Sequence, residues 1–289
     1  MDRSKFIRPK KTLLSRLFTP KLKRKFRMPF ARMTASQRQM PGYIVIGTHK
    51  GGTSSIQSYL VQHPQLSGGT HKEVHFFDYQ YHRGENWYRA IFPRSSDLAP
   101  GTLTGDATPL YMVHPLVPAR VKKLLPNVKL IVLLRDPVNR SISHYYHQVR
   151  RGRESLIIED GFAAEAERIG PDKKRLKAGE EFKVEGFRRF SYVERSLYAD
   201  QLERWFEHFP KEQFFIDTSE RFYGDTENFL SDVFTFLGVD AGFKVPDLQP
   251  RNVGMAREDD PEMRATLREF FAPHNERLEK LVGRIFDWQ

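Results

Sequence analysis

Residues 43–60, YIVIGTHKGGTSSIQSYL, have the order of apolar residues, glycines and hydroxyls that is typical of an anion-binding loop. Four apolar or aromatic residues precede a glycine-rich turn, and a helical pattern follows the turn. A turn of this kind presents backbone N–H groups and the positive end of a helix dipole to an anion. The residues that we assign to this site are Lys50, Gly51, Gly52, Thr53, Ser54 and Ser55.

The lysine of this loop is not where a triphosphate loop has it. The pattern G-x-x-x-x-G-K-[ST] puts a lysine directly before the hydroxyl that holds magnesium. Here Gly47 and Gly52 have the required separation, but Thr53 follows directly and the lysine is Lys50. The apolar run at residues 130–134 also ends in an arginine rather than in a magnesium-binding aspartate. We therefore predict a nucleotide with a single 5′ phosphate in the loop, bound without metal.

A second anion-binding group follows the strongest apolar run of the chain, residues 130–134. Arg135 closes this run, and its planar guanidinium suits phosphate oxygens. Ser143 lies in the first turns of a helix that we expect to begin at Pro137. An arginine that ends a strand often has only a structural role. Its position downstream of a phosphate loop favours binding of a second phosphate by Arg135 and Ser143.

The predicted elements must bring these two groups together. Short apolar runs at residues 43–46 and 130–134 predict buried strands, and each leads directly into a helix. Strands that alternate with helices predict a parallel sheet covered on both faces. The expected fold class is α/β, a P-loop-type three-layer sandwich with a mostly parallel central sheet. Further helices are predicted at residues 53–62, 115–126, 191–210, 226–237 and over most of the chain after 251, and further strands within 102–111 and at 213–218.

Two regions are expected to carry no chemistry. Residues 150–189 are rich in charge and weakly periodic, which predicts a flexible insertion with one helix near residues 162–169. In the helix predicted at residues 191–210, we expect the aromatic side chains in the core rather than in contact with a ligand. These side chains are Tyr198, Trp205 and Phe206.

The formal net charge of +11 is concentrated at one end of the chain. Residues 1–40 hold 13 of the 47 Lys and Arg and a single acidic residue, Asp2, which leaves 34 basic and 35 acidic residues in the rest. The body is therefore near neutral, and its charge gives little support to a nucleic-acid partner. We divide the chain into a basic, flexible leader, residues 1–40, and a single domain, residues 41–289.

The leader contains no apolar run near the roughly 20 residues that span a bilayer, and no apolar core of a signal peptide. An alternative to a solvated leader is an amphipathic element that contacts an anionic membrane weakly through lysines and four apolar residues, Leu13, Leu14, Leu17 and Phe18. The chain has no cysteine, which excludes disulfides and cysteine-ligated metals. We expect a cytoplasmic protein of bacterial type, peripheral at the membrane only under that alternative.

Five motifs in order resemble the glycosaminoglycan sulfotransferases, especially the glucosaminyl sulfotransferases of heparan sulfate. They are KGGTSS, KEVHFFD at residues 72–78, RDPVNRSISHYY, RSLYADQLERWFEHFP and the terminal LVGRIFDW. The resemblance runs over residues 41–289, and its specificity comes from the order and spacing of the motifs. It implies a fold similar to that of nucleotide kinases and the sulfate donor 3′-phosphoadenylyl sulfate (PAPS), with no metal.

The resemblance also implies roles for the residues already singled out. The 5′ phosphosulfate of PAPS would lie on residues 50–55, and its 3′ phosphate on Arg135 and Ser143. Glu73 would remove the proton from the attacking hydroxyl or amine, with His75 nearby, while Lys50 stabilises charge on the leaving phosphate oxygen. Two simpler alternatives stay open: Glu73 as a loop carboxylate paired with Lys72, and His75 as a packed, hydrogen-bonded histidine.

The sequence departs from its relatives where they touch acceptor or cofactor. Ala107 replaces a lysine that often precedes the Thr-Pro of DATPLY, and His49 replaces an arginine before the loop lysine. The loop QPRNVGMARED lacks the cysteines of a disulfide-closed counterpart, so that we assign a cofactor contact to Arg251 instead. The residues assigned to the acceptor side are Lys72, Asp78 and Thr108.

Three functions follow, in order of preference. The first is a PAPS-dependent sulfotransferase acting in line on a carbohydrate hydroxyl or amine, with a small non-carbohydrate alcohol as the alternative acceptor. The second is a nucleotide kinase-like phosphotransferase, which the lysine position and the missing carboxylate disfavour. The third is a non-enzymatic binder of anionic polymers that uses the basic leader.

Overall fold

The structure is a computed structural model, and it describes residues 28–180, 182–251 and 261–288. Five strands in this part of the chain form one sheet in the order β2-β3-β1-β4-β5. Every neighbouring pair of strands is parallel, as the sequence predicts. The strands are β1 (Pro41–Gly47), β2 (Leu66–Gly68), β3 (Leu103–Ala107), β4 (Lys129–Leu134) and β5 (Phe214–Thr218).

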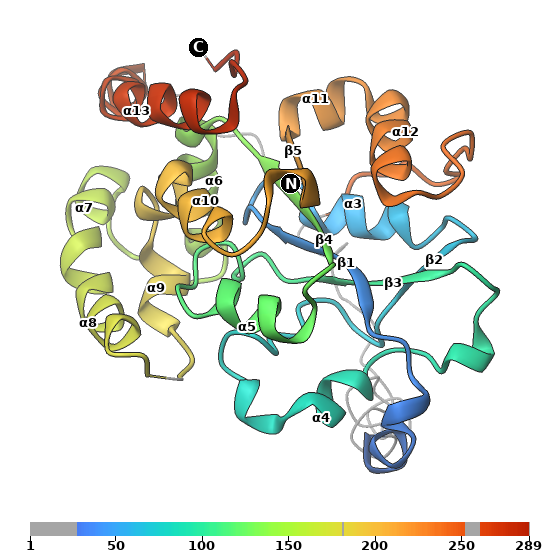
Figure 1. Cartoon of the computed structure of the whole chain (residues 1–289). Helices are drawn as coiled ribbons and strands as arrows, with labels where there is room; N and C mark the ends of the chain where they lie inside the picture. Colours follow the sequence, from blue (N-terminus) through green and yellow to red (C-terminus); the bar gives the residue numbers. More distant parts are fainter. Residues whose placement is uncertain (1–27, 181, 252–260, 289) are drawn as a thin grey trace, which may run out of the picture.

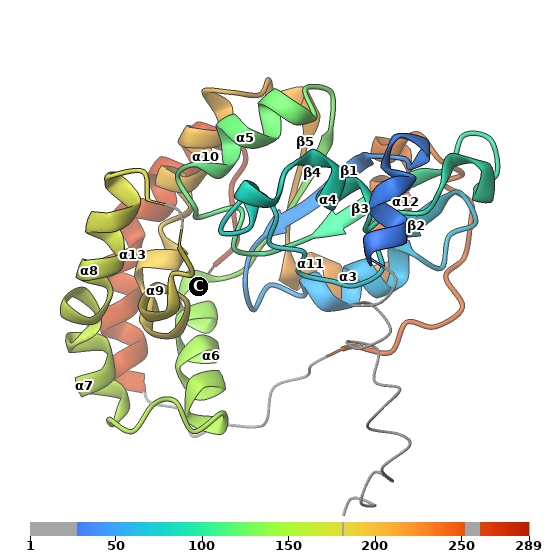
Figure 2. The same cartoon turned by 90° about the horizontal axis from the view of Figure 1, so that it is seen from below.

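Helices cover both faces of this sheet, which makes three layers (Figures 1 and 2). Successive strand residues point to opposite faces, so Ile44 and Ile46 of β1 join one core while Tyr43 and Val45 join the other. The predicted three-layer sandwich is confirmed. The first core includes residues of α4 (Glu85–Arg89), α5 (Val117–Leu124), α10 (Tyr198–Phe206) and α13 (Pro261–Val282). The second includes residues of α3 (Thr53–Leu60), α11 (Ser219–Gly224) and α12 (Thr226–Leu237), which ends at the left-handed Gly238.

The carboxyl ends of β1 and β4 lie side by side at one edge of the sheet. The loop after β1 leads into α3, and the two residues after β4 lead into α6 (Pro137–Arg150). Asp136 caps α6, because its carboxylate accepts the N–H of Val138 at 2.9 Å. Crevices at such an edge are where open α/β sheets bind ligands.

The segment at residues 150–189 differs from the prediction. Instead of one helix in a flexible insertion, it contains α7 (Ile158–Ala163), α8 (Glu165–Lys177) and α9 (Glu185–Phe190). A small cluster fixes α8 and α9 to the loop after β3, where Leu110 and Val113 pack with four residues of the segment, Ile169, Leu176, Val184 and Phe187. Many positions of the segment hold charged residues that pair with each other, such as Arg175 and Glu180. These charged residues interrupt the apolar periodicity by which a helix is recognised in a sequence.

The helix predicted at residues 191–210 begins only at Tyr198. Side chains from elsewhere satisfy the backbone before it: Arg140 donates to the carbonyls of Ser191 and Tyr192, and Glu165 accepts the N–H groups of Val193 and Glu194. This stretch is therefore a bend, followed by one 3₁₀ turn. Of the three aromatic residues expected in the core, Tyr198 and Trp205 are buried and Phe206 is partly buried against the same cluster.

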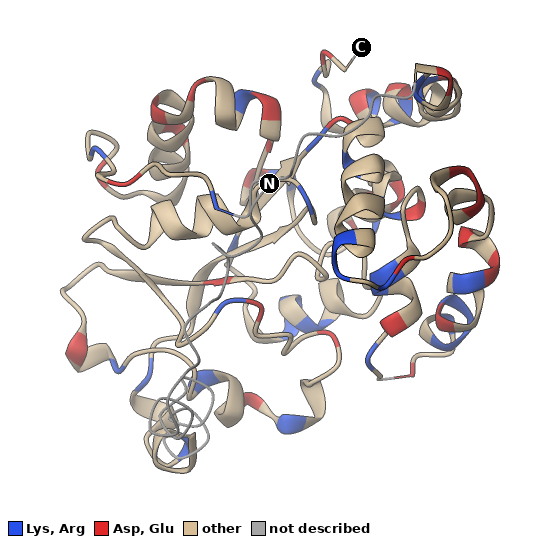
Figure 3. Cartoon of the chain, turned by 180° about the vertical axis from the view of Figure 1, so that it is seen from behind, with Lys and Arg blue, Asp and Glu red and all other residues tan. Residues whose placement is uncertain are grey.

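Residues 28–40, which the sequence analysis counts in the leader, contact the domain. Ala35 is buried, Arg38 donates to the carbonyl of Phe92 at 2.5 Å, and Gln39 donates to that of Thr102 at 2.6 Å. The four apolar leader residues proposed to meet lipid, at positions 13–18, lie outside the described residues. Figure 3 shows basic and acidic residues interspersed over the described domain. None of its helices is long and apolar enough to cross a membrane.

Candidate active site

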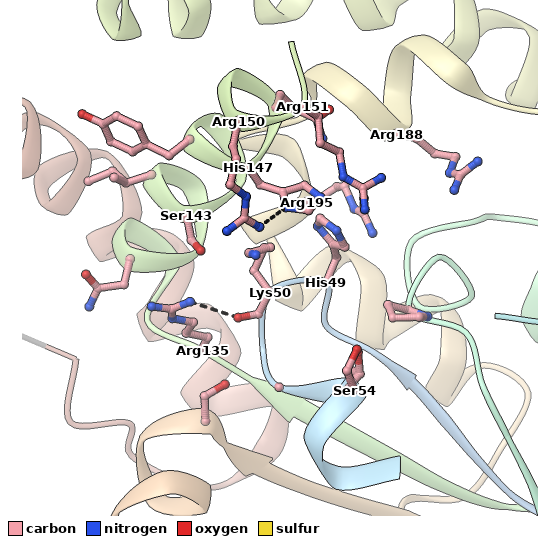
Figure 4. Close-up of a pocket in the computed structure, with 18 of the residues that line it drawn as sticks. His49, Lys50, Ser54, Arg135, Ser143, His147, Arg150, Arg151, Arg188 and Arg195 are labelled. Atoms are coloured by element: carbon pink, nitrogen blue, oxygen red, sulfur yellow. Dashed lines mark hydrogen bonds between the residues drawn. The ribbon is translucent and has the colours of Figure 1, made fainter. Parts of the chain in front are cut away.

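A cavity of about 950 Å³ opens at the carboxyl edge of the sheet, beside the loop after β1 (Figure 4). Its lining includes the β1–α3 loop, the KEVHFFD loop, α6, and residues of α9 and the turn that follows it, together with residues of α11, of α13 and of the loop after β3. The lining residues that the sequence analysis singles out are Lys50, Gly52, Thr53, Ser54, Glu73, His75, Arg135, Ser143 and Arg251.

The β1–α3 loop has a conformation that only glycine fits at two positions. Gly52 has φ +94°, and a Cβ on Gly51 would lie 2.5 Å from the carbonyl oxygen of Leu133. The loop is tied to the end of β4, because Ser219 donates its hydroxyl to the carbonyls of Gly51 and Leu134, each at 2.8 Å. The first N–H groups of a helix have no partner within that helix. The start of α3 lies at the cavity, so that its N–H groups are available to an anion there.

Cations surround this loop. The carbonyl of Lys50 accepts from Arg135 at 3.0 Å, which fixes the guanidinium beside the loop. Lys72 crosses from the neighbouring loop and donates to the hydroxyl of Ser54 at 2.6 Å and to that of Thr53 at 3.4 Å. Burial lowers the pKa of Lys72 to about 8, while the nearby Glu73 opposes this shift.

The remaining residues assigned to the cofactor flank the same loop. Ser143 of α6 is buried and lines the cavity next to Arg135. Arg251 donates its backbone N–H to the hydroxyl of Ser55 at 2.9 Å. Ser55 also bonds Tyr223 at 3.2 Å, so that its hydroxyl is already engaged inside the protein.

In the KEVHFFD loop, one histidine contacts two carboxylates. His75 Nδ1 lies 2.6 Å from Asp78 Oδ2, and its Nε2 lies 3.6 Å from Glu73 Oε2. Burial opposes protonation of His75, but its bonds to Asp78 and then to Glu73 outweigh burial and raise its pKa. The His75 bond, with the Lys72 charge, lowers the pKa of Glu73 to about 2. Glu73 is therefore a carboxylate that lines the cavity, and His75 is the side chain that holds it, with its pKa raised in favour of the charged form.

Buried hydroxyls hold this loop in place from behind. Tyr111 accepts the N–H groups of Phe76 and Phe77 and donates to Asp106 Oδ2 at 3.1 Å. Asp106 is 2% exposed and also accepts from Tyr88 and Thr108. Burial raises the pKa of Asp106 to about 6 despite these bonds. Glu73 and His75 both have positive φ, 57° and 56°, in a loop that this network holds.

The opposite wall of the cavity is basic, and sequence analysis missed most of it. His49 and His147 have ring centroids 5.7 Å apart, and burial followed by neighbouring cations keeps both neutral: the pKa of His147 falls to about 4 and that of His49 well below its usual value. The arginines of this wall are Arg150, Arg151 and Arg153 at the end of α6, Arg188 and Arg189 in α9, and Arg195 in the 3₁₀ turn before α10.

The structure thus brings most predicted residues to one cavity, and leaves some outside its lining. Gly51, Ser55 and Lys72 adjoin it through the contacts described above. Asp78 is fully buried behind His75, and Thr108 is fully buried on Asp106. The missed arginines lie in or beside the segment expected to carry no chemistry. Their signal in the sequence was only a cluster of basic residues among compensating acidic ones.

Known sulfotransferases are similar to this protein over most of its chain. A family profile described as "Sulfotransferase domain" matches residues 41–252. The membrane-associated sulfotransferase kil1 of Dictyostelium discoideum is 30% identical, over 86% of this chain and 67% of its own. Heparan sulfate glucosamine 3-O-sulfotransferase 3B1 of Homo sapiens is 30% identical, over 88% of this chain and 66% of its own. The chain thus spans about two thirds of the length of these relatives.

The fold is similar to that of a solved protein as well. The crystal structure of a sulfotransferase from Alicyclobacillus acidocaldarius superposes with a TM-score of 0.70 at 30% identity. The match covers 86% of this chain and 98% of the other. The shared fold therefore includes nearly the whole of that protein.

Proposed function

The chain belongs to the sulfotransferase domain family, and from this premise we propose that it transfers a sulfuryl group from PAPS to a hydroxyl or amine of a carbohydrate. The observation that carries the proposal is the joint position of Lys50, Arg135 and Glu73 on one cavity. Two separate groups of cations suit a donor with phosphates at both ends, and a carboxylate opposite them suits proton removal from an acceptor.

The donor would be held by the loop after β1 and by α6. The N–H groups at the start of α3, with Lys50 and the hydroxyls of Thr53 and Ser54, would receive the 5′ phosphosulfate. Arg135 and Ser143 would receive the 3′ phosphate. The fit is supported by the conformation of this loop, because the positive φ of Gly52 and the close approach of Gly51 to Leu133 pack the turn against the end of β4 and so place the start of α3 at the cavity.

Glu73 would act as the base. With a pKa of about 2 it is ionised at neutral pH, and His75 fixes its carboxylate. A base this weak takes the proton only as the S–O bond forms, when the acceptor hydroxyl has become strongly acidic. His75 has a carboxylate at each ring nitrogen, so that we assign it to holding Glu73 rather than to accepting a proton itself.

A carbohydrate acceptor is supported by the named activity of the heparan sulfate relative. The open, partly basic cavity also leaves room beside the donor loop for a sugar. Arg251 is assigned to the cofactor side, and Lys72, which contacts Ser54, to the border between donor and acceptor. Asp78 and Thr108 would then act through His75 and Asp106, because both are buried.

The leader is the remaining part of the proposal. We place the protein in the cytoplasm, with residues 1–40 making weak contact with anionic membranes through their excess of Lys and Arg. Co-sedimentation with anionic liposomes at low salt tests this directly. Binding by the full chain that is lost in residues 41–289 supports a membrane role for the leader, whereas equal binding by both rejects it.

The decisive test of activity is transfer of ³⁵S from labelled PAPS to a panel of glycans and small alcohols. We expect label on at least one glycan and a rise in melting temperature with 3′-phosphoadenosine 5′-phosphate (PAP), the product nucleotide. Label on small alcohols alone would correct the acceptor class. No label on any acceptor together with no thermal shift by PAP would reject the function.

A further inference from the structure

Arg195 is a buried cation without a counter-ion. Its side chain is 3% exposed, and its Nε has no hydrogen-bond partner. Within the described ranges, no salt bridge joins Arg195 to a carboxylate, although sixteen acid–base pairs occur elsewhere in the same part of the chain. Leaving a charge buried and unpaired is costly, so a position of this kind calls for an anion from outside the protein.

A neighbouring buried arginine differs from Arg195 in the bonds that its other nitrogens make. Within the described residues Arg140 has no salt bridge either, and its Nη1 has no hydrogen-bond partner, but its Nε donates to the hydroxyl of Ser196 at 2.6 Å and its Nη2 donates to the carbonyls of Ser191 and Tyr192. These bonds hold the stretch before α10 in place, and Arg195 lies in that stretch. Arg140 is thus structural, whereas Arg195 is positioned by it and faces the cavity.

The surroundings of Arg195 locate the missing anion. Its charge acts on His49, the residue before Lys50, and the charge of Glu73 acts on Arg195 in turn. Figure 4 shows Arg195, His49 and Lys50 together in the middle of the cavity. Arg195 therefore lies between the loop assigned to the donor and the carboxylate assigned to the base.

In an in-line transfer, the sulfuryl group must lie between the donor phosphate and the acceptor atom, and therefore between the donor loop and Glu73. We infer that Arg195 is a further catalytic residue, which donates two N–H groups to the non-bridging oxygens of the sulfuryl group as it is transferred. This inference rests on the proposed function. The rim arginines at the end of α6, in contrast, are exposed to solvent and are placed to meet the acceptor rather than the reacting atoms.

The step balances without any further reactant. The bond between sulfur and the bridging oxygen breaks, and its electron pair goes to the 5′ phosphate of PAP. The acceptor oxygen or nitrogen forms the new bond to sulfur, and its proton goes to Glu73. Arg195 would donate to two of the three sulfuryl oxygens, which carry negative charge throughout, because its planar guanidinium presents two N–H groups at once. Burial and the charges of Arg140 and Arg188 lower its pKa to about 9, which still leaves it cationic at neutral pH.

The test variant is Arg195→Met, which keeps the length of the side chain and removes its charge. We expect turnover on the acceptor found in the ³⁵S panel to fall by about 10²- to 10³-fold, the loss typical of one electrostatic donor at a transition state. Affinity for PAPS should fall about 10-fold or more, whereas affinity for PAP, which lacks the sulfuryl group, should change less than about twofold. Arg195→Lys keeps the charge without the fork and should recover part of the loss.

The melting temperature of the ligand-free protein separates this role from a structural one. Because Arg195 is unpaired, Arg195→Met should melt at the same temperature as the parent or higher. A structural arginine would behave in the opposite way. Arg204→Met is the matched control: Arg204 is on α10, outside the cavity lining, and donates to the carbonyl of Val113 at 3.3 Å, so that its loss should leave the PAPS-to-PAP preference unchanged.

Five results would overturn the inference. Undiminished turnover in Arg195→Met would show that the sulfuryl group does not need the cation. Equal losses of PAPS and PAP affinity would place Arg195 on a phosphate, and a raised KM for acceptor alone would place it on the acceptor. If Arg195→Met does not fold, the role is structural and the inference fails. A parent protein that neither transfers label nor binds PAP removes the proposed function, and this inference with it.

Discussion

The carboxylate wall and the basic wall of the cavity differ in whether their charged groups have partners within the protein. On the carboxylate wall, His75 contacts both Glu73 and Asp78, and Tyr111 holds their loop from behind. On the basic wall, Arg195 is buried without a counter-ion, and burial followed by neighbouring cations lowers the pKa of His49 well below its usual value. A base can be set in place before the substrate arrives, because its carboxylate already has a partner within the protein, His75. An anion site remains unbalanced until the anion binds, and this imbalance is what draws the donor.

The largest effect should come from breaking the carboxylate wall. Glu73→Gln removes the proton acceptor but keeps the shape of the side chain, so that turnover should fall about 10²- to 10⁴-fold. PAP should still raise the melting temperature by the same amount as in the parent. Turnover with saturating PAPS and a PAP titration measure the two quantities.

A matched carboxylate controls for this loss. Glu185 of α9 lines the same cavity but is paired with Lys183 at 2.5 Å and with Arg189 at 3.2 Å. Glu185→Gln should retain turnover within a few-fold. If both variants lose activity equally, the effect comes from the cavity's overall charge and Glu73 is not the base.

A smaller effect should follow from loosening the support of that wall. Tyr111→Phe keeps the ring and removes the hydroxyl that joins the N–H groups of Phe76 and Phe77 to Asp106. We expect kcat to fall by about 10-fold, because misplacing Glu73 by a fraction of an ångström weakens a reaction that depends on alignment. Unfolding should become easier by about 1–3 kcal/mol, since buried polar groups lose a partner.

The same variant separates positioning from general damage. PAP affinity should not change, because the hydrogen bonds of the Tyr111 hydroxyl go to Phe76, Phe77 and Asp106 and not to the donor loop. Denaturant unfolding and kcat are measured together with PAP binding. A fall in PAP affinity that matches the fall in kcat would mean that the whole cavity is disturbed, and that the two walls are not independent.

The smallest effect is a pH dependence on the donor side. The pKa of Lys72 is lowered to about 8 by burial, so this lysine is cationic below pH 8 and loses its charge above it. We expect kcat/KM for PAPS to decline above about pH 8, as one positive charge near the loop is lost. Glu73, with a pKa of about 2, should cause no decline between pH 5 and 8.

Lys72→Arg tests whether Lys72 causes the decline in kcat/KM above about pH 8. Arginine stays protonated across the whole range, so the decline should move to higher pH by at least about one unit. A decline that remains at pH 8 in Lys72→Arg comes from another group, with deprotonation of His75 as the first candidate, since its raised pKa means that its charge is lost only as pH rises.

What could be predicted from the sequence is what depends on local pattern. The runs before Gly47 and Arg135 predict the two central strands, and the glycines of the loop predict the anion site, because strand, turn and helix start follow from neighbouring residues. Glu73 could be assigned only through the resemblance, since KEVHFFD has no periodicity. It is tertiary bonds to Tyr111 and His75 that turn this loop into a site.

What could not be predicted depends on contacts between distant segments. Arg195 lies in a stretch whose pattern continues an amphipathic helix. Only tertiary bonds, of the Tyr192 carbonyl to Arg140 and of the Glu194 N–H to Glu165, show that this stretch forms a bend and a 3₁₀ turn rather than the start of α10. The helices α8 and α9 were missed because paired charges cover them and their apolar residues pack on Leu110 and Val113. A single sequence carries little trace of either arrangement.

The central claim is that one nucleotide with two phosphates is held at opposite ends by the loop after β1 and by Arg135. The most direct measurement compares the melting-temperature shifts caused by PAP and by AMP, which lacks the 3′ phosphate, in the parent and in Arg135→Gln. We predict that PAP stabilises the parent far more than AMP does, and that the difference disappears in Arg135→Gln. Equal shifts by PAP and AMP in the parent, or a difference that persists in Arg135→Gln, would contradict the account.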